Sequence, residues 1–453
     1  MLPLIEAVEE LRDWFTGQTG IRLQPWPLLA LGLVLLVLSY VFMPSVVALA
    51  VSIALFLAPV WLPFLLLGGA WGMWYVMKRS EFIAAQTNIL LEIKPPRNLV
   101  KTPLAMEAFL SSIHFTGGES TWYARLLGGI RPFYSLEIAS LEGQVHFFVW
   151  TRASFRRIIE SQIYAQYSGA QVVEALDYSR LISAKPEEWL IWGCDFKHTA
   201  PTPLPIKTYI EFGLDKVQKE PEQVDPLANL IEFMGSIGKG EYIWLQFVIR
   251  AHKGERYHKL NAKGKPYTWR DEAEELVQEI RKKTRDSYID VVTGEERPGF
   301  PNPTKGQSEQ IAAIERNVSK LAFDVGARGV YLAKPDKFNG AMVVHLIALF
   351  KPFTSEGWNG INSSAWMKRF DDYPWEIFAD KVKDHYRRKL VEAFRRRQFF
   401  YDPFGHGISP NDTMVMSTEE LATIFHIPSR AVETPGLGRI QSAVGEAPPN
   451  LPT

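Results

Sequence analysis

The 453-residue chain has one cysteine, no net charge, and no charged residue at all between Leu23 and Met77. A single cysteine, Cys194, excludes an intramolecular disulfide and a metal cluster built from several thiolates, and we expect it to be a small buried apolar residue. The 50 basic residues balance 50 acidic ones, so no overall field selects nucleic acid or an anionic surface. The acidic start of the chain lacks the basic region of a secretory signal, so we expect no cleavage there.

The uncharged stretch is the strongest feature of the sequence. One membrane-spanning helix needs about 20 apolar residues, so this stretch is too long for one helix and suits two. We expect spans at about 27–43 and 46–76, with a break at Pro44 and Ser45 and a tilt or kink at the prolines of the second span. The alternative, a buried hairpin in a soluble core, leaves so long an uncharged stretch unexplained.

The flanks of this stretch predict its orientation. Arg22 precedes it and Lys78 and Arg79 follow it, whereas the connection near Pro44 carries no charge. By the positive-inside rule, both ends face the cytoplasm. The sequence therefore predicts a transmembrane hairpin over 23–79 in the inner (cytoplasmic) membrane, multi-pass, with both termini cytoplasmic. Residues 1–22 are predicted to form an amphipathic helix, which lies at the interface or docks on protein.

From residue 80 onward the pattern is that of a mixed α/β domain. Residues 80–180 show the order β-α-β-β-α-β, with a hairpin turn at Glu142 and Gly143. The expected strands are 89–93, 134–139, 145–150 and 170–175, and the expected helices are 103–113 and 155–167. This is the order of a ferredoxin-like unit, in which two helices cover one face of an antiparallel sheet.

A second, looser copy is expected over 181–335. Its expected strands are 206–211, 242–250 and 323–334, and its expected helices are 227–234 and 306–321. A charged insertion over 252–303 interrupts it and carries a helix at 271–285. Residues 336–433 are predicted to be mainly helical, with helices at 340–349 and 375–397. The predicted fold class is therefore α+β: a two-helix transmembrane hairpin followed by tandem ferredoxin-like units.

The sequence offers no catalytic constellation. The nearest approach to a phosphate-binding loop is the segment from Gly235 to Gly240, but Phe233 and Gly240 occupy the positions where that motif needs glycine and a hydroxyl residue. The segment also follows a helix and precedes a strand, so we read it as a turn. The nine histidines form no metal-binding motif. We predict no enzyme activity, no cofactor and no metal site.

Two basic regions are candidates for partner contact. The first is the helix at 375–397, whose predicted partner-binding residues are Arg387, Arg388, Arg395, Arg396 and Arg397. Such a face is usually solvated; it can also contact lipid headgroups or a nucleic-acid backbone, and proximity to the membrane ranks lipid or protein above nucleic acid. The second is the stretch from His252 to Lys265, either a solvated loop or a docking surface for acidic protein or nucleic acid.

The Pro- and Gly-rich tail, 434–453, is predicted to be an extended partner-binding element or linker. Its prolines oppose regular structure, yet it keeps apolar residues, of which Leu437, Ile440 and Leu451 are the candidate contacts. The alternative is that the tail folds back onto its own domain.

Several segments resemble one family. These are LEIKPP at 91–96, KTPLAME at 101–107, SLEIAS at 135–140, IYAQY at 163–167, ALDY at 175–178, FKPF at 350–353 with Asn359 and Gly360, and LATIFH at 421–426 with Pro428. Together they resemble the N-terminal region of membrane-anchored, conjugation-type ATPases of candidate-phyla bacteria, relatives of type IV secretion and HerA/FtsK-like proteins, from about residue 80 to the end. In that family the segment resembling 446–452 leads into a RecA-like motor domain, whose Walker residues have no counterpart in this sequence.

The resemblance implies a non-enzymatic membrane adaptor that positions a hexameric motor ATPase, supplied by another chain, at the membrane. Its implied partners are membrane lipid, that ATPase, and further copies of the chain itself. The implied homo-oligomer to test is a hexamer. The alternative is an N-terminal fragment of a full-length secretion or DNA-transfer ATPase. A small-molecule enzyme on a ferredoxin-like scaffold is a third class of function, and no residue in the sequence supports it.

Overall fold

The computed structural model describes residues 32, 34, 37–96, 99–119, 121–183, 185, 187–216, 225–253, 260–261, 264–289, 296–364, 379–397, 399–401, 413–429 and 436–439. The chain divides into two compact units, Met1–Tyr75 and Val76–Thr453. The helix expected over 1–22 and most of the first expected span lie outside the described residues. The predicted boundaries at 180 and 335 both fall inside the second unit.

The first unit contains apolar helices. Helix α3 covers Pro44–Phe56, and α4 covers Ala58–Ala84 and continues into the second unit. Among the described residues, α4 is the one helix long and apolar enough to cross a membrane, and its apolar window has no buried residue. Its 27 residues span about 40 Å, against about 30 Å for the hydrocarbon layer.

The predicted second span, 46–76, is wrong in its boundaries, because the helix is divided at Leu57. Pro59 has no N–H to continue the helical ladder, and its ring clashes with the carbonyl four residues earlier, so the break falls just before it. Pro63 lies inside α4 without ending it. A two-helix hairpin is not shown by the described residues.

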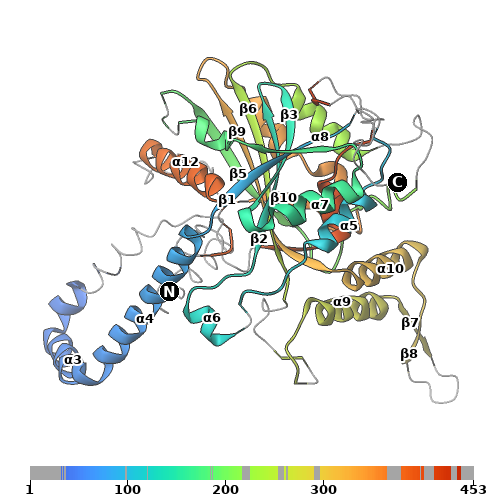
Figure 1. Ribbon diagram of the computed structural model, residues 1–453. Helices are drawn as coiled ribbons and strands as arrows, with labels where there is room; N and C mark the ends of the chain where they lie inside the picture. The colour runs from blue at the N-terminus through green and yellow to red at the C-terminus, as the bar shows by residue number, and fades with distance from the viewer. Residues whose placement is uncertain are drawn as a thin grey trace. The chain divides into compact units, whose positions relative to one another are not determined.

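Nine strands among the described residues form a single antiparallel sheet in the second unit (Figure 1). They are β1 (Asn88–Lys94), β2 (Phe133–Leu141), β3 (Gln144–Arg152), β4 (Gln171–Ala175), β5 (Leu190–His198), β6 (Glu241–Ala251), β9 (Ala322–Ala333), β10 (Ile361–Ser364) and β11 (Met414–Ser417). Their order is β10-β5-β9-β6-β2-β3-β1-β4, and β11 pairs with the start of β9. The fold is therefore α+β, as predicted.

Five helices cover one face of this sheet and bury the main apolar core. They are α5 (Leu104–Ser112), α7 (Arg156–Gln166), α8 (Pro226–Gly235), α11 (Gly340–Ile347) and α13 (Thr418–Ile424). Alternate residues of the central strands, such as Leu136 and Ile138 on β2, point into this core. The opposite face is covered by α12 (Ala379–Arg395), the short helix η2 (Tyr178–Leu181) and residues 399–401. Figure 1 shows α12 and α7 on opposite sides of the sheet.

The first half of the sheet follows the sequence prediction closely. The elements expected between residues 89 and 175 are confirmed as β1, α5, β2, β3, α7 and β4, to within a few residues at each end. The predicted hairpin turn is also confirmed: Glu142 has φ 55° and Gly143 has φ 90°. Two successive residues with positive φ give the two-residue turn whose twist matches that of the flanking strands. A short helix, α6 (Trp122–Leu126), and a 3-10 turn, η1 (Ala153–Phe155), were not expected.

The second half contains one wrong prediction. Residues 206–211 are not a strand; the strand is β5, at 190–198, paired with β9 and β10. The backbone N–H groups of the expected strand bond side chains instead: that of Ile206 donates to Glu420 and that of Tyr209 to Thr423. The α8, β6, α10, β9 and α11 predictions are confirmed, and of the helix expected at 375–397 the described part is α12.

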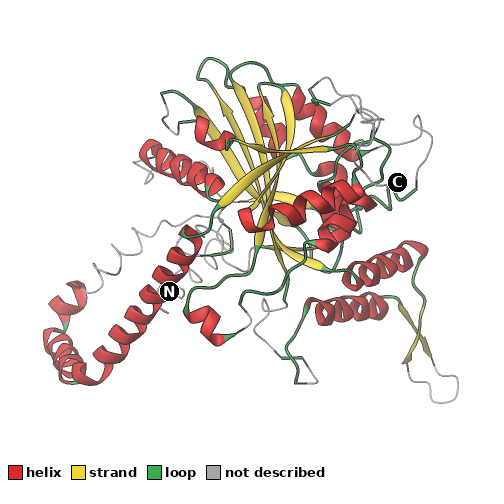
Figure 2. Ribbon diagram, in the orientation of Figure 1, coloured by secondary structure: helices red, strands yellow, loops and turns green. Residues whose placement is uncertain are grey.

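The charged insertion forms a separate arm between β6 and β9. It consists of α9 (Trp269–Lys283), the two-stranded ribbon of β7 (Arg285–Ile289) and β8 (Glu296–Pro301), and α10 (Lys305–Ser319). The two helices lie side by side, with the ribbon beyond them, away from the sheet (Figure 2). Ala273 and Ile314 pack on Leu204 at the base of the arm. A last 3-10 turn, η5, covers Lys351–Phe353.

Candidate functional site

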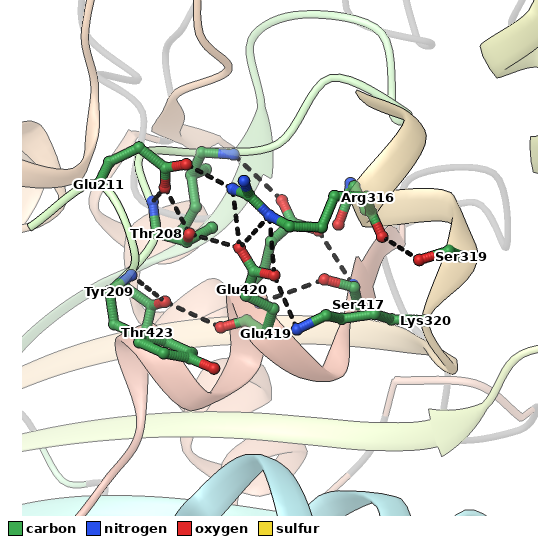
Figure 3. Close-up of polar contacts among 12 residues, drawn as sticks. Thr208, Tyr209, Glu211, Arg316, Ser319, Lys320, Ser417, Glu419, Glu420 and Thr423 are labelled. Atoms are coloured by element: carbon green, nitrogen blue, oxygen red, sulfur yellow. Dashed lines mark hydrogen bonds and ion pairs between the residues drawn. The ribbon is translucent and has the colours of Figure 1, made fainter. Parts of the chain in front are cut away.

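A buried group of acidic, basic and hydroxyl side chains surrounds α13 (Figure 3). We call it the α13 cluster, and its acidic and basic members are Glu107 on α5, Glu211 in the turn after β5, Arg316 and Lys320 at the end of α10, and Glu419 and Glu420 on α13.

The cluster is built on the start of α13. The backbone N–H of Ser417 donates to Glu420 Oε2 at 3.0 Å, and the N–H of Glu420 donates to Ser417 Oγ at 3.2 Å. This reciprocal capping box satisfies two N–H groups that a helix start leaves open, so the helix begins at Thr418. The other oxygen of Glu420 accepts the Ile206 N–H at 3.1 Å, and the side chain is fully buried.

Burial raises the pKa of Glu420 to about 8, although the two backbone N–H donors act in the opposite direction. Its carboxyl group is therefore mainly protonated at neutral pH. Asn317 is also within hydrogen-bonding contact of Glu420, and Asn317 Oδ1 is buried with no partner among the described residues.

Glu419 is the ionised centre of the cluster. Its side chain is 2% exposed and contacts Arg316 Nε at 3.2 Å and Lys320 Nζ at 2.8 Å. Burial alone would raise the pKa of Glu419, but the bond from Lys320 and the charge of Arg316 outweigh burial and lower it. Thr208 Oγ1 lies 2.5 Å from an oxygen of Glu419 and 2.5 Å from an oxygen of Glu211. A hydroxyl has one proton, so it donates to one of these carboxylates at a time.

Lys320, the second cation of the cluster, connects α5 to it through Glu107. Lys320 Nζ lies 2.7 Å from Glu107 Oε1, and Tyr209 donates its hydroxyl to Glu107 Oε2 at 2.6 Å. Burial would lower the pKa of Lys320, but its bonds to Glu107 and Glu419 raise it. The cluster thus joins α5, the turn at 206–211, α10 and α13, which are far apart in sequence, through ion pairs between oppositely charged side chains.

A second polar group crosses the other face of the sheet. Glu137, Gln246, Arg328 and Asp195 lie opposite one another on β2, β6, β9 and β5, and each is at most 1% exposed. We call them the cross-sheet row. Gln246 Nε2 donates to Glu137 Oε1 at 3.1 Å, and Arg328 Nε donates to Asp195 Oδ1 at 2.7 Å. Buried charges of this kind are retained when they are paired and hydrogen-bonded.

Arg397 covers the Glu137 end of this row. It is 1% exposed, and it donates through Nε to Glu137 Oε1 at 2.9 Å and through Nη1 to Asp177 Oδ2 at 2.6 Å. Its φ of 52° lies in a region that non-glycine residues seldom adopt, so the surrounding contacts hold it there. Burial would lower the pKa of Arg397, but the charges of Glu137 and Asp177 raise it.

The residues that follow continue this cover. The Phe399 ring occupies the space above Gly326, where a Cβ atom would lie 2.1 Å from it. Arg250 stacks under Phe400, 4.5 Å from the ring centroid, and under Tyr401 at 5.2 Å. Arg250 also pairs with Asp324 at 2.8 Å.

The predicted basic face of α12 is only partly open. Arg388 is exposed, Arg387 pairs with Asp384 at 2.9 Å, and Arg396 pairs with Glu392. The expectation that the face includes Arg397 is wrong, and Arg395 is only half-exposed. Arg395 donates to the carbonyls of Ser179 and Ile182, and Arg397 is buried on the sheet.

Other predicted contact residues also point inward. Leu437 is 7% exposed, belongs to the main core, and bridges Val145 of β3 in parallel. At this residue the tail therefore folds back onto its own domain, which was the alternative expectation; Ile440 and Leu451 lie outside the described residues. His252 is likewise not in a solvated loop, because it pairs with the buried Asp324 at 2.6 Å. His258 lies outside the described residues.

The structure locates the other sequence candidates. Cys194 is buried, as predicted, and burial raises the pKa of its thiol. The segment from Gly235 to Gly240 leaves α8 and enters β6, which confirms it as a turn, with φ 84° at Gly240. Within the described part of the chain, no group of three or more histidine, cysteine, aspartate or glutamate residues is arranged to hold a metal.

An open groove of about 1040 Å³ runs along the arm between α9 and α10. Its walls carry both signs of charge, and Arg281 approaches Glu315 across it at 3.7 Å. A mixed, open lining of this kind does not select a small ligand in the way an enclosed apolar pocket does.

Neither the α13 cluster nor the cross-sheet row was predicted from the sequence. Signals for both are present: Ser417 followed three residues later by Glu420 is a capping-box pattern, and Glu137 and Gln246 interrupt apolar strands. Partners such as Lys320 and Arg397 lie too far along the chain to be paired from one sequence.

Comparison with known proteins assigns a family and no function. No curated protein matches the chain significantly. Residues 78–438 match the family model described as a domain of unknown function, DUF8128. Because that match covers well over half of the sequence, the protein belongs to the DUF8128 family.

Proposed function

We propose that the protein is a non-enzymatic membrane adaptor, in which α4 crosses the bilayer and the α+β domain is a rigid platform for a partner. The observation that carries this proposal is α4 itself, an apolar helix of 27 residues with no buried residue in its apolar window. A core helix of a soluble protein with this composition would be buried. An unburied one finds its apolar surroundings in lipid.

The last turns of α4 belong to the platform itself. Phe82 and Ile83 pack with Ile130 and Phe133, and Arg79 lies 5.2 Å from the centroid of the Tyr401 ring. The last residues of α4 are therefore part of the packing of the second unit.

The buried polar groups also suit a platform better than a catalyst. In the α13 cluster and the cross-sheet row, the described charges pair with one another across distant segments. Such networks specify one arrangement of the chain, and leaving one partner unpaired is costly.

The strand order suggests how the platform arose. The first half has the order β2-β3-β1-β4, and the second half has β6-β9-β5-β10, the same order for its first, second, third and fourth strands. We infer two ferredoxin-like units joined through their second strands, β2 and β6, with the arm inserted between β6 and β9.

The partner of this proposal is the one that the sequence resemblance implies, a hexameric HerA/FtsK-like motor ATPase on another chain, with copies of the adaptor assembled around it. The proposed topology has two crossings and cytoplasmic termini. The second candidate is that these residues are the N-terminal part of a full-length ATPase. Nothing in the α13 cluster favours nucleic acid as a partner.

A co-purification experiment tests the adaptor. The tagged full chain is extracted from its native membranes in mild detergent, and co-purifying proteins are identified by mass spectrometry. The proposal expects a Walker-type ATPase as a separate chain in amounts comparable to the bait, with Mg-ATP hydrolysis that disappears when that chain is removed by a salt wash. ATP hydrolysis by the washed chain alone would contradict the non-enzymatic adaptor. A single larger polypeptide that carries both these residues and the ATPase motor domain would establish the second candidate.

A further inference from the structure

The loop that follows the short helix α6 lies directly against the end of the candidate membrane helix. A Cβ atom on Gly128, two residues after α6, would lie 2.4 Å from the carbonyl oxygen of Lys78 and 2.7 Å from the nitrogen of Arg79. The loop backbone thus touches the α4 backbone at its first charged residues. Gly128 has φ 78°, so both the space and the conformation require glycine there.

The segment that carries α6 is held firmly by the domain. Gly129 donates its N–H to the Ala124 carbonyl at 2.8 Å, and Gly118 approaches Ile130 so closely that a Cβ atom would lie 2.6 Å from its carbonyl oxygen. Arg131, which is 2% exposed, donates to the Ala251 carbonyl at 2.8 Å. The position of α6 beside Lys78 is therefore fixed by the fold.

Helix α6 and the residue after it display large apolar side chains to solvent. Trp122 is 72% exposed, Tyr123 is 65% exposed, and Leu127 is 52% exposed. Tryptophan and tyrosine combine an apolar ring with a polar group, and they are enriched where the hydrocarbon layer meets water.

The level of α6 along α4 matches that boundary. The apolar part of α4 ends at Met77, and Lys78 is where the helix would leave the hydrocarbon. Helix α6 is only about 7 Å long, so its two aromatic residues stay near the level of Lys78. The interfacial layer is roughly 5–7 Å deep on each side of the bilayer.

We propose that α6 is a second membrane contact, in which Trp122 and Tyr123 insert among the phospholipid headgroups beside the point where α4 emerges. This rests on the proposed function, because it needs α4 in a bilayer. One helix alone leaves the domain free to rotate about the helix axis and to tilt. A second contact beside the helix limits both motions and fixes which face of the domain looks away from the membrane.

The test places a polarity-sensitive fluorophore at single cysteines of the full chain, reconstituted in phospholipid nanodiscs. The background is Cys194→Ala, and the test sites are Trp122→Cys and, separately, Tyr123→Cys. Leu65→Cys reports on α4. Lys239→Cys is the matched exposed control, because it precedes β6 at the end of the sheet opposite to the Arg250 and Phe133 pair. Along β2 that separation is roughly 27 Å.

Lipids carrying a nitroxide in the headgroup or deep in the acyl chain then act as quenchers. We expect loss of fluorescence at 122 and 123 with the headgroup quencher, loss at 65 with the deep quencher, and no loss at 239 with either. Loss at 65 with no more loss at 122 and 123 than at 239 would overturn the second contact and leave the membrane anchor intact. No loss at 65 would overturn the anchor itself. Protection of 122 from a water-soluble quencher without lipid quenching would mean that protein, a second copy of the chain, covers α6.

Discussion

Replacing Arg397 with methionine tests whether the buried charges hold the domain together. Methionine keeps a long unbranched side chain, and it meets the same unusual backbone conformation as arginine. The substitution removes the donors at 2.9 Å from Glu137 Oε1 and 2.6 Å from Asp177 Oδ2. Among the described residues, Glu137, which is 0% exposed, then keeps neutral donors: the hydroxyls of Ser135 and Tyr178 and the amide of Gln246.

Leaving one partner of a buried ion pair uncompensated costs about 3–5 kcal/mol. For a unit running from Val76 to Thr453, the entropy of unfolding is roughly 0.8 kcal/mol per degree, so the midpoint should fall by about 4–6 °C. The assay is thermal unfolding of the reconstituted full chain, followed by tryptophan emission. Trp150 reports locally, because the Arg397 guanidinium lies 5.5 Å from its ring centroid.

The neighbouring residue provides the matched control. Arg396 is 47% exposed and pairs with Glu392 one helical turn away, so Arg396→Met should change stability by less than about 0.5 kcal/mol. The double variant Glu137→Gln with Arg397→Met removes the orphaned charge and should recover part of the loss. If Arg397→Met melts within a degree of Arg396→Met, the buried network is not what stabilises the α12 face.

Two further predictions concern the helix-covered face. Because the pKa of Glu420 is about 8 in the folded protein and 4.5 is its ordinary value, the folded state binds the extra proton, and stability should fall by up to about 1.4 kcal/mol per pH unit as the pH rises from 4.5 to 8. In Glu420→Gln the contribution of Glu420 to the pH dependence of the unfolding free energy should be lost, which denaturant titrations at several pH values measure. The cost of the lost hydrogen-bond acceptor does not change with pH. A pH dependence equal to that of the parent protein would refute a protonated Glu420 carboxyl group. Leu437→Ala should destabilise the domain by about 2–5 kcal/mol, because Leu437 fills the core beside β3. If Leu437→Ala unfolds at the same midpoint as the parent protein, Leu437 is not part of the core and remains a candidate partner contact.

The sequence was most informative where the signal was local. Alternation of apolar residues located β2 and β3, and Glu142 with Gly143 located their turn. The strand at 190–198 was missed because Gly193 and Asp195 interrupt its apolar pattern. Both residues have a tertiary explanation: a Cβ atom at 193 would lie 2.7 Å from a methyl of Leu390, and Asp195 pairs with Arg328.

The wrong assignment at Arg397 and the inward contacts of Arg395 share one cause. Periodicity shows which residues of a helix lie on the same face, but it does not show what lies opposite that face. The carboxylate that receives Arg397 is on β2, 260 residues earlier in the chain. The charge of Arg397, which was expected to face solvent or a partner, is thus paired inside the domain. No local sequence pattern reveals such a pair.

The most direct test of the central claim asks whether the two ends of α4 lie on opposite sides of a membrane. In a Cys194→Ala background, Leu57→Cys precedes α4 and Thr87→Cys follows it. Intact cells expressing either variant are treated with a membrane-impermeant maleimide, before and after permeabilisation. The account predicts labelling of residue 57 in intact cells and labelling of residue 87 only after permeabilisation. Equal labelling of both positions in intact cells, or of neither, would contradict a membrane-crossing α4.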